Sequence, residues 1–293
     1  MKHWQSIIQH IEETTGQAFS VMKQRVVAGG SINNAFVITG DDGEQYFVKI
    51  NHAGQLPMFQ AEVRGLQALA SSHSIRVPNP VCFGDDGMQS YIVLEYLDLS
   101  GSANQTELGE QLATMHRVQA DQFGWGIDNT IGATHQPNHK TDNWVDFWRD
   151  QRLGFQLQLA ADNGYGGELQ SLGEKLLVDM PKLFTDRVIR PSMLHGDLWG
   201  GNVAGLSDGT PVVYDPAFYY GDREADLAMT YVFGGFTADF YASYQSTYPL
   251  DDGFAVRKTF YNTYHIINHL NMFGGGYHNQ SINMLEQVLA EIS

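Results

Sequence analysis

The sequence is poor in the features that mark secreted or membrane-spanning proteins. Its 293 residues contain one cysteine, Cys82, so no disulfide can form within the chain and a disulfide-built extracellular scaffold is excluded. No stretch approaches the roughly 18 consecutive apolar residues that a membrane-spanning helix requires, and no apolar signal segment follows the first residues. We therefore expect a soluble, cytoplasmic protein.

Basic residues are also scarce. Lysine and arginine total 17 against 33 aspartates and glutamates, which gives a formal charge of −16. A field of this sign repels phosphate backbones and anionic lipid, so we expect no nucleic-acid partner and no membrane partner. Cysteine and histidine do not gather at zinc-ligand spacing. The 43% of hydrophobic residues is typical of a globular protein, long enough here for one large domain or two lobes.

The first third of the chain predicts a small β-rich lobe. Apolar residues at helical spacing begin at Trp4 and stop before Gly16, which predicts an N-terminal helix. A second helix with one apolar face is expected over residues 58–71. Apolar and β-branched runs separated by Gly-rich or Asp-Gly turns predict five strands, at residues 21–27, 35–38, 46–50, 81–83 and 91–94.

Beyond residue 98 the pattern becomes helical. Helices are expected over residues 107–118, 144–161, 167–180, 224–233, 238–248, 254–271 and 282–292. The only strands expected there form a short hairpin, at residues 203–206 and 211–214. The expected fold class is therefore α+β, with a β-rich N-terminal lobe over residues 1–98 and a larger, mainly helical lobe over residues 99–293.

The strongest chemical signal is a run of polar residues after a short apolar stretch. His195, Asp197 and Asn202 reproduce the H-x-D-x-x-x-x-N spacing of a kinase catalytic loop. Phosphoryl transfer needs a carboxylate to accept the proton of the attacking hydroxyl and an amide oxygen to hold a metal on the phosphates. Asp215 follows the hairpin, where a second metal-binding carboxylate belongs. The alternative is that these residues only order a tight turn through side-chain to backbone hydrogen bonds.

The N-terminal lobe supplies candidate phosphate-binding residues in the order that a kinase uses. Gly29, Gly30 and Ser31 join two expected strands and can lay backbone N–H groups over phosphates. Lys49 lies on a strand after that loop, and Glu62 lies on the following helix, where it can pair with Lys49. Taken alone, Lys49 could be an edge-strand charge and Glu62 part of a solvated helix face. Their shared order with the catalytic-loop motif favours function.

In these motifs the sequence resembles the fructosamine kinase (ketosamine-3-kinase) family, whose relatives are the aminoglycoside and choline phosphotransferases of the protein-kinase-like fold. The specific match is His-Gly-Asp-Leu-Trp-Gly-Gly-Asn-Val at residues 195–203, in which Trp199 separates this family from its relatives. Similar stretches extend the resemblance over nearly the whole chain, at residues 93–97, 108–116, 214–221, 224–228, 233–236 and 269–274.

The resemblance implies that the cofactors are ATP and Mg²⁺ and assigns residues to them. Lys49 would hold the ATP phosphates and Glu62 would brace Lys49, below the loop of Gly29, Gly30 and Ser31. Asn202 and Asp215 would bind Mg²⁺. The backbone groups of Glu95, Tyr96 and Leu97, which form the hinge after the last strand of the first lobe, would bind adenine.

The same resemblance assigns the acceptor side. Asp197 would be the catalytic base, or at least the carboxylate that orients the sugar hydroxyl. Trp199 would line the sugar pocket, with His195 also on the substrate side, because an aromatic face suits the C–H surface of a sugar. The alternative for Trp199 is a buried core residue, since tryptophan is often buried.

Two departures from the family pattern concern charge and redox chemistry. Asp222 stands where family members usually carry histidine, which puts the role of that corner near the substrate in doubt. Ser31 stands where many members have a cysteine in the glycine loop, so redox control there is not expected. Cys82, on an expected strand, is interpreted as a small buried hydrophobic residue.

The function expected is transfer of the ATP γ-phosphate to the sugar 3-hydroxyl of a ketosamine, such as a fructosamine or ribulosamine adduct. The substrate would be free or attached to protein lysine, and the unstable product would shed its sugar, so the enzyme would act in deglycation. One alternative is an aminoglycoside- or choline-type small-molecule kinase, and another is a nucleotide-binding pseudokinase that serves as an interaction module. The sequence does not determine the oligomeric state, although a monomer is favoured.

Overall fold

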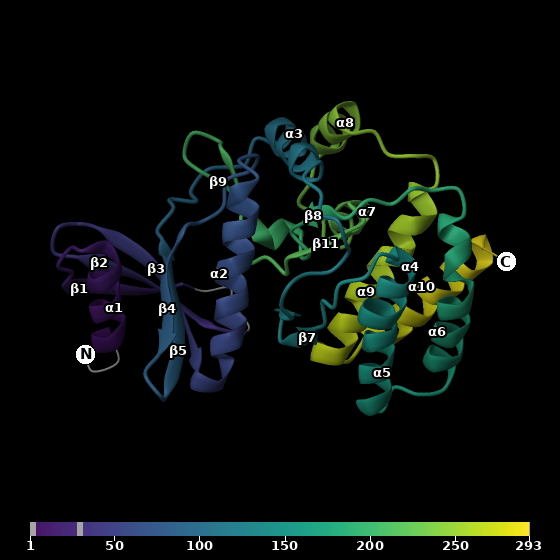
Figure 1. Cartoon of the computed structure of the whole chain (residues 1–293), viewed down its shortest axis with the longest axis horizontal. Coiled ribbons are helices and arrows are strands. Elements are labelled where there is room, and N and C mark those ends of the chain that lie inside the picture. The colour runs from purple at the N-terminus through teal and green to yellow at the C-terminus, as the bar shows by residue number, and fades with distance from the viewer. Residues whose placement is uncertain (1–3, 28–31, 293) are drawn as a thin grey trace. The chain divides into compact units, whose positions relative to one another are not determined.

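The computed structural model describes residues 4–27 and 32–292, which fall into two compact units (Figure 1). The first unit is Met1–Asn104 together with Ala204–Asp215, and the second is Gln105–Val203 together with Pro216–Ser293. The chain therefore returns to the first unit after the catalytic-loop motif. The sequence instead predicts one boundary at residue 98, which places residues 99–104 and 204–215 in the second lobe.

The first unit is an antiparallel sheet with two helices, as the sequence predicts. Its strands lie in the order β1-β2-β3-β5-β4. They are β1 (Val21–Val27), β2 (Asn34–Gly40), β3 (Gln45–His52), β4 (Pro80–Asp85) and β5 (Gln89–Glu95). The helices are α1 (Gln5–Thr15), which ends at Gly16 in a left-handed conformation, and α2 (Leu56–Ser71), which follows the short 3₁₀ turn η2 (Ala53–Gln55).

The alternation of side chains along β3 decides what each face of the sheet carries. Tyr46, Val48 and Ile50 are buried in one apolar cluster with residues of α1. Successive side chains of a strand point to opposite faces, so Lys49 lies on the other face, where it reaches a residue of α2. Cys82 is buried in the α1 cluster, where burial raises the pKa of its thiol to about 12, as expected of a buried hydrophobic residue.

The predicted hairpin in the middle of the chain is present as β9 (Val203–Gly205) and β10 (Pro211–Val213). Its attachment to the first unit is made by backbone hydrogen bonds. The N–H of Gly101 donates to the carbonyl of Gly205 at 3.1 Å, and the N–H of Val213 donates to the carbonyl of Arg76 at 3.0 Å. A Cβ on Gly101 would lie 1.9 Å from the carbonyl oxygen of Leu206, so the close approach requires glycine there.

The second unit is mainly helical around an aromatic core that includes Trp148, Phe260 and Tyr261. Its α-helices are α3 (Gln105–Met115), α4 (Trp144–Trp148), α5 (Gly154–Asp162), α6 (Glu168–Asp179), α7 (Glu224–Met229), α8 (Ala238–Thr247), α9 (Phe254–Phe273) and α10 (Tyr277–Glu291). Shorter turns are η3 (Arg149–Leu153), η4 (Met180–Phe184) and η5 (Gly200–Asn202). The helix expected over 144–161 is thus interrupted by a π-helical turn, η3.

The expectation of only two strands in this part of the chain is wrong. Four further three-residue strands are present, β6 (Asn129–Ile131), β7 (Thr134–Gln136), β8 (Ser192–Leu194) and β11 (Tyr219–Gly221). Three residues are too few to show an alternating pattern, so sequence periodicity does not detect them. The pairing of β8 with β11 is the important one, because it fixes the loop that begins at His195 beside the segment that follows Pro216.

Among the described residues, 4–27 and 32–292, no helix is both long enough and apolar enough to cross a membrane.

Candidate active site

A buried lysine on β3 contacts two carboxylates in the first unit. Lys49 Nζ donates to Glu62 Oε1 at 2.7 Å and also to Asp215 Oδ1. Burial would lower the pKa of Lys49, but Asp215 and Glu62 outweigh it and hold that pKa well above its usual value, so the ammonium stays charged. The predicted pairing of Lys49 with Glu62 is therefore present. We call these three residues the Lys49 group.

Asp215 differs from its two partners in exposure and in backbone conformation. Its side chain is 45% exposed, against 8% for Lys49 and 10% for Glu62. Its φ angle is 57°, in the left-handed region that non-glycine residues rarely adopt. Such backbone strain is retained mainly at functional sites, where the surrounding structure enforces it.

The expected adenine-binding segment follows the end of β5. The N–H of Glu95 already donates to the carbonyl of Asn79 at 2.9 Å, and its carboxylate pairs with Arg76. Among the described residues, none accepts a hydrogen bond from the N–H of Tyr96 or Leu97. The backbone N–H groups that remain for the predicted binding of adenine are therefore those of Tyr96 and Leu97. Gly29, Gly30 and Ser31, the expected phosphate loop, lie outside the described residues.

The catalytic-loop motif forms a tight turn in the second unit. The side-chain amide of Asn202 donates to the Asp197 carbonyl oxygen at 2.9 Å and to its Oδ2 at 3.2 Å. The N–H of Asp197 donates to Nδ1 of the fully buried His195 at 3.3 Å. These contacts are the turn-ordering bonds of the alternative interpretation, and they also fix the orientation of the Asp197 carboxylate. A turn ordered by side-chain hydrogen bonds and a catalytic loop are therefore compatible interpretations of this motif.

Gly196 in this turn cannot be replaced by a larger residue. Its φ angle is 85°, and a Cβ there would lie 1.9 Å from the carbonyl oxygen of Ala217. Only glycine combines this conformation with this contact. The loop thus lies directly against the segment that follows Pro216.

Asp226 on α7 stabilises the same turn through hydrogen bonds from the backbone of that turn. The sequence did not predict this role. Its carboxylate accepts the N–H of His195 at 2.7 Å and that of Gly196 at 2.8 Å. It also contacts His116 Nε2 at 3.2 Å, and His116 Nδ1 lies 2.8 Å from the hydroxyl of Tyr244. Burial would raise the pKa of Asp226, but its partners, His116 first, hold that pKa below its usual value. An aspartate followed directly by Leu-Ala-Met on a buried helix was the available signal.

Trp199 is not a core residue. It is 36% exposed, and its ring meets that of Phe233 edge-on with centroids 5.7 Å apart. Phe233 in turn contacts the ring of His269 at 4.9 Å. A Cβ on Gly200 would lie 2.8 Å from the Gly234 carbonyl oxygen, so the segments carrying Trp199 and Phe233 touch through glycines. Trp199, Phe233 and His269 form a partly exposed aromatic group in the second unit.

Asp222, the departure from the family pattern, belongs to a buried ion-pair network. It is 1% exposed, both its oxygens accept from Arg187, and the hydroxyl of Tyr261 donates to Oδ2 at 2.5 Å. Arg187 also pairs with Glu224 and Asp251, and Arg257 pairs with the same two carboxylates. We call Arg187, Asp222, Glu224, Asp251 and Arg257 the Arg257 network. Asp222 therefore stabilises the second unit through its buried contacts.

Asn202 in the second unit and Asp215 in the first each carry an oxygen atom of a kind that a hard cation binds. Because the Asn202 NH₂ group is used by Asp197, its amide oxygen remains as a ligand, and Asp215 supplies a partly exposed carboxylate. Mg²⁺ prefers oxygen ligands of these two kinds. Among the described residues, no three His, Cys, Asp or Glu side chains gather as a metal centre.

Comparisons with known proteins point to one family. A family model described as fructosamine kinase matches residues 3–291. A probable ketoamine kinase from Synechocystis sp. is 48% identical over 98% of this chain and 97% of its own. The chloroplastic protein-ribulosamine 3-kinase of Arabidopsis thaliana is 40% identical over 94% of this chain and 85% of its own.

Solved structures agree on the fold. A crystallised protein from Haemophilus somnus 129PT, assigned as a fructosamine-3-kinase, superposes with a TM-score of 0.89 at 31% identity, over 98% of this chain and 97% of its own. The aminoglycoside phosphotransferase APH(2'')-Ib reaches 0.66 at 14% identity, over 98% of each chain, and shows the fold alone. The expected protein-kinase-like α+β fold is confirmed.

Proposed function

Because this chain belongs to the fructosamine kinase family, a family of phosphotransferases that act on hydroxyl groups, we propose that it phosphorylates the sugar 3-hydroxyl of ketosamines. Fructosamine and ribulosamine adducts, free or attached to protein lysine, are the proposed substrates, and deglycation is the proposed role. ATP is the proposed donor, with Mg²⁺.

The Lys49 group is the observation that carries this proposal. Lys49 lies between Glu62, 13 positions away, and Asp215, 166 positions away, so one charged ammonium contacts two carboxylates, one of them partly exposed. In the proposed reaction Lys49 binds phosphate oxygens of ATP, Glu62 holds Lys49 in place, and Asp215 and Asn202 hold Mg²⁺. When bound, Mg²⁺ would neutralise part of the negative charge on the ATP phosphates. The backbones of Tyr96 and Leu97, which follow Glu95, bind adenine.

Asp197 is proposed as the base that accepts the proton of the attacking hydroxyl. Its carboxylate is oriented by Asn202, and its backbone turn is held by Asp226 through two N–H groups. A fixed carboxylate suits this task because proton transfer requires the base within hydrogen-bond distance of the hydroxyl. His195 is buried beneath the turn, so we assign it an ordering role behind Asp197.

Trp199 is proposed to line the sugar pocket. It lies two positions beyond Asp197 and keeps 36% of its surface exposed, with Phe233 and His269 beside it. The apolar C–H face of a sugar packs well on such rings.

The test is ATP turnover measured with fructosamine, ribulosamine and erythrulosamine adducts of lysine. We expect turnover that depends on a ketosamine, with product phosphate on the 3-hydroxyl by ³¹P NMR, and none with kanamycin or choline. Turnover with kanamycin or choline alone would establish a different acceptor, and no turnover with any acceptor would leave a pseudokinase.

The variant Asp197→Ala should lower kcat by roughly 10²–10⁴-fold with nearly unchanged affinity for the nucleotide. Asp121→Ala is the matched control, because Asp121 is exposed and outside the motif. Near-normal kcat in Asp197→Ala would remove this residue from the mechanism.

A further inference from the structure

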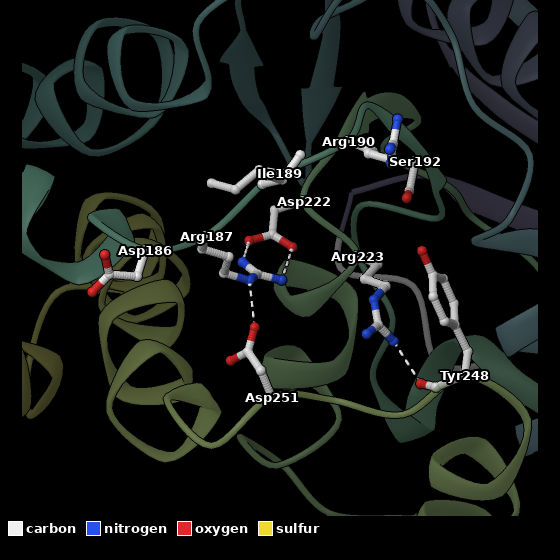
Figure 2. Close-up of a pocket in the computed structure, with 10 residues that line it drawn as sticks. Asp186, Arg187, Ile189, Arg190, Ser192, Asp222, Arg223, Tyr248 and Asp251 are labelled. Atoms are coloured by element: carbon white, nitrogen blue, oxygen red, sulfur yellow. Dashed lines mark hydrogen bonds and ion pairs between the residues drawn. The ribbon is translucent and has the colours of Figure 1, made fainter.

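A second polar site lies in the second unit, beside the Arg257 network. A cavity of about 230 Å³ opens there, smaller than the roughly 300–1,000 Å³ of pockets that hold drug-sized ligands. Figure 2 shows that its lining divides in two. On one side Arg187 is occupied by Asp222 and Asp251, and on the other lie Arg190, Ser192, Arg223 and Tyr248.

The arginines on this second side lack carboxylate partners. Among the described residues, none pairs through a carboxylate with Arg190, Arg223 or the neighbouring Arg117. The guanidinium carbons of Arg223 and Arg117 lie 3.7 and 5.2 Å from the centroid of the Tyr248 ring. The lining also holds three carboxylates, but Asp222 and Asp251 pair with Arg187 and Asp186 lies on the side of Arg187, so Arg190 and Arg223 keep guanidinium groups that no described carboxylate pairs with.

Arg223 is already oriented but not saturated. Its guanidinium donates to the hydroxyl of Tyr244 at 3.0 Å, to the carbonyl of Tyr248 at 2.7 Å and to the carbonyl of Pro249. Three of its five N–H groups are used in this way, which leaves two for a ligand. A guanidinium held in one position loses little conformational freedom when it binds an anion.

Two hydroxyl groups complete the lining. Ser192 is only 2% exposed, yet it lines the cavity, and the hydroxyl of Tyr248 lines it as well. In the part of the chain that the structure describes, no side chain or carbonyl forms a hydrogen bond with either hydroxyl. Both hydroxyls are therefore open to the cavity and can donate to an acceptor ligand that lies beside the two arginines.

We propose that this cavity binds a phosphate group, held by the guanidinium groups of Arg190 and Arg223 and by the hydroxyls of Ser192 and Tyr248. A phosphate offers three or more oxygen acceptors and up to two negative charges, which matches two guanidinium forks and two hydroxyls. A carboxylate has only two oxygens and one charge. The ligand is inorganic phosphate or the phosphate of a small phosphomonoester.

The variants are chosen to leave the catalytic loop intact. Arg223 contacts Tyr244, which contacts His116 below the catalytic turn, so Arg223 itself is left unchanged. Arg190→Gln removes an exposed charge, and Tyr248→Phe removes one hydroxyl but keeps the ring against the guanidinium groups. Arg64→Gln, on the exposed side of α2, is the control for loss of an arginine.

The experiment is calorimetric titration of the full chain with inorganic phosphate and, separately, with glycerol 3-phosphate at constant ionic strength. We expect saturable binding that Arg190→Gln weakens about 10- to 100-fold and Tyr248→Phe weakens several-fold, the usual range for charge-assisted and neutral hydrogen bonds. Binding should be unchanged in Arg64→Gln. Tighter binding of either probe supports the proposal and identifies the source of the phosphate group.

Lys49→Met separates this site from the nucleotide site, because Lys49 is the other candidate phosphate ligand. Binding that persists in Lys49→Met and is weakened in Arg190→Gln supports the cavity. Binding that is lost in Lys49→Met and unchanged in Arg190→Gln overturns it, as does equal affinity for acetate. Ketosamine turnover should be normal in Arg190→Gln, so failure here leaves the proposed kinase activity standing, and the melting temperature of each variant confirms that it folds.

Discussion

The Lys49 group and the Arg257 network both concentrate charge, but they are built from different residues. The Lys49 group places one ammonium between two carboxylates. The Arg257 network places two guanidinium groups among three carboxylates, two of them 0–1% exposed. An ammonium is a compact charge that can exchange partners, whereas a guanidinium holds a carboxylate in a fixed, forked geometry. The comparison teaches that the group built on lysine suits ligand exchange and the network built on arginine suits stability.

Breaking the Arg257 network should have the largest effect, and on stability alone. Asp222→Ala should lower the free energy of unfolding by about 3–5 kcal/mol, because it leaves Arg187 buried beside an unpaired Tyr261 hydroxyl. Denaturant titration measures this loss. Asp222→Asn, which keeps the shape, should lose less. A stable Asp222→Ala protein with impaired turnover would reverse the comparison and place Asp222 at the substrate.

Breaking the Lys49 group should affect catalysis first. Lys49→Met should lower kcat/KM for ATP by roughly 10²–10³-fold, the usual cost of removing one group that stabilises transition-state charge. The double variant Lys49→Met/Glu62→Gln removes the unpaired buried carboxylate as well, so it should recover stability but not activity. Recovery of both would mean that the pair is structural, like the Arg257 network.

Trp199 tests whether a partly exposed aromatic group serves the substrate. Trp199→Ala should raise the KM for the ketosamine by a factor equivalent to about 1–3 kcal/mol, taking base stacking on aromatic rings as the nearest measured case. The KM for ATP and the melting temperature should change little, since the ring is partly exposed. Trp199→Phe, which keeps a ring, should be less affected. Similar increases in the KM for the ketosamine and the KM for ATP, together with a lower melting temperature, would indicate a packing role.

The buried side chain of His265 should show the smallest effect, through the pH dependence of stability. Burial lowers the pKa of His265 to about 3, whereas a histidine in an unfolded chain has a pKa near 6.5. The unfolded state therefore binds more protons below pH 6.5, and stability present above that pH is lost as the pH falls toward 3.

Between pH 7 and 5.5 the loss from His265 should be roughly 1 kcal/mol. Unfolding measured at both pH values should show a smaller loss in His265→Asn than in the unchanged protein. An equal loss in both proteins would mean that the pKa of His265 is not lowered in the folded state. A buried histidine in this unit would then carry a charge without an arginine network around it.

Much of the first unit could be predicted from local pattern. The strand at residues 21–27 and the helix over residues 58–71 lie where the sequence predicts them, and the helix buries one apolar face. The three-residue strand β8 and its partner β11 could not be predicted, because so short a segment carries no period of its own. The π-helical turn at Arg149–Leu153 was missed for a related reason, since its residues continue the helical pattern on both sides.

The sequence alone determined the fold class, the family and the identity of Asp197, Asn202 and Lys49 as candidates, because motif spacing and apolar periodicity are local properties. Only the tertiary structure decided which distant residues support them. Asp226 reaches the catalytic turn across 31 positions, and Arg187 reaches Asp222 across 35. Such pairs form only when helices and strands have packed, since the desolvation that makes a buried charge need a partner exists only in the folded core.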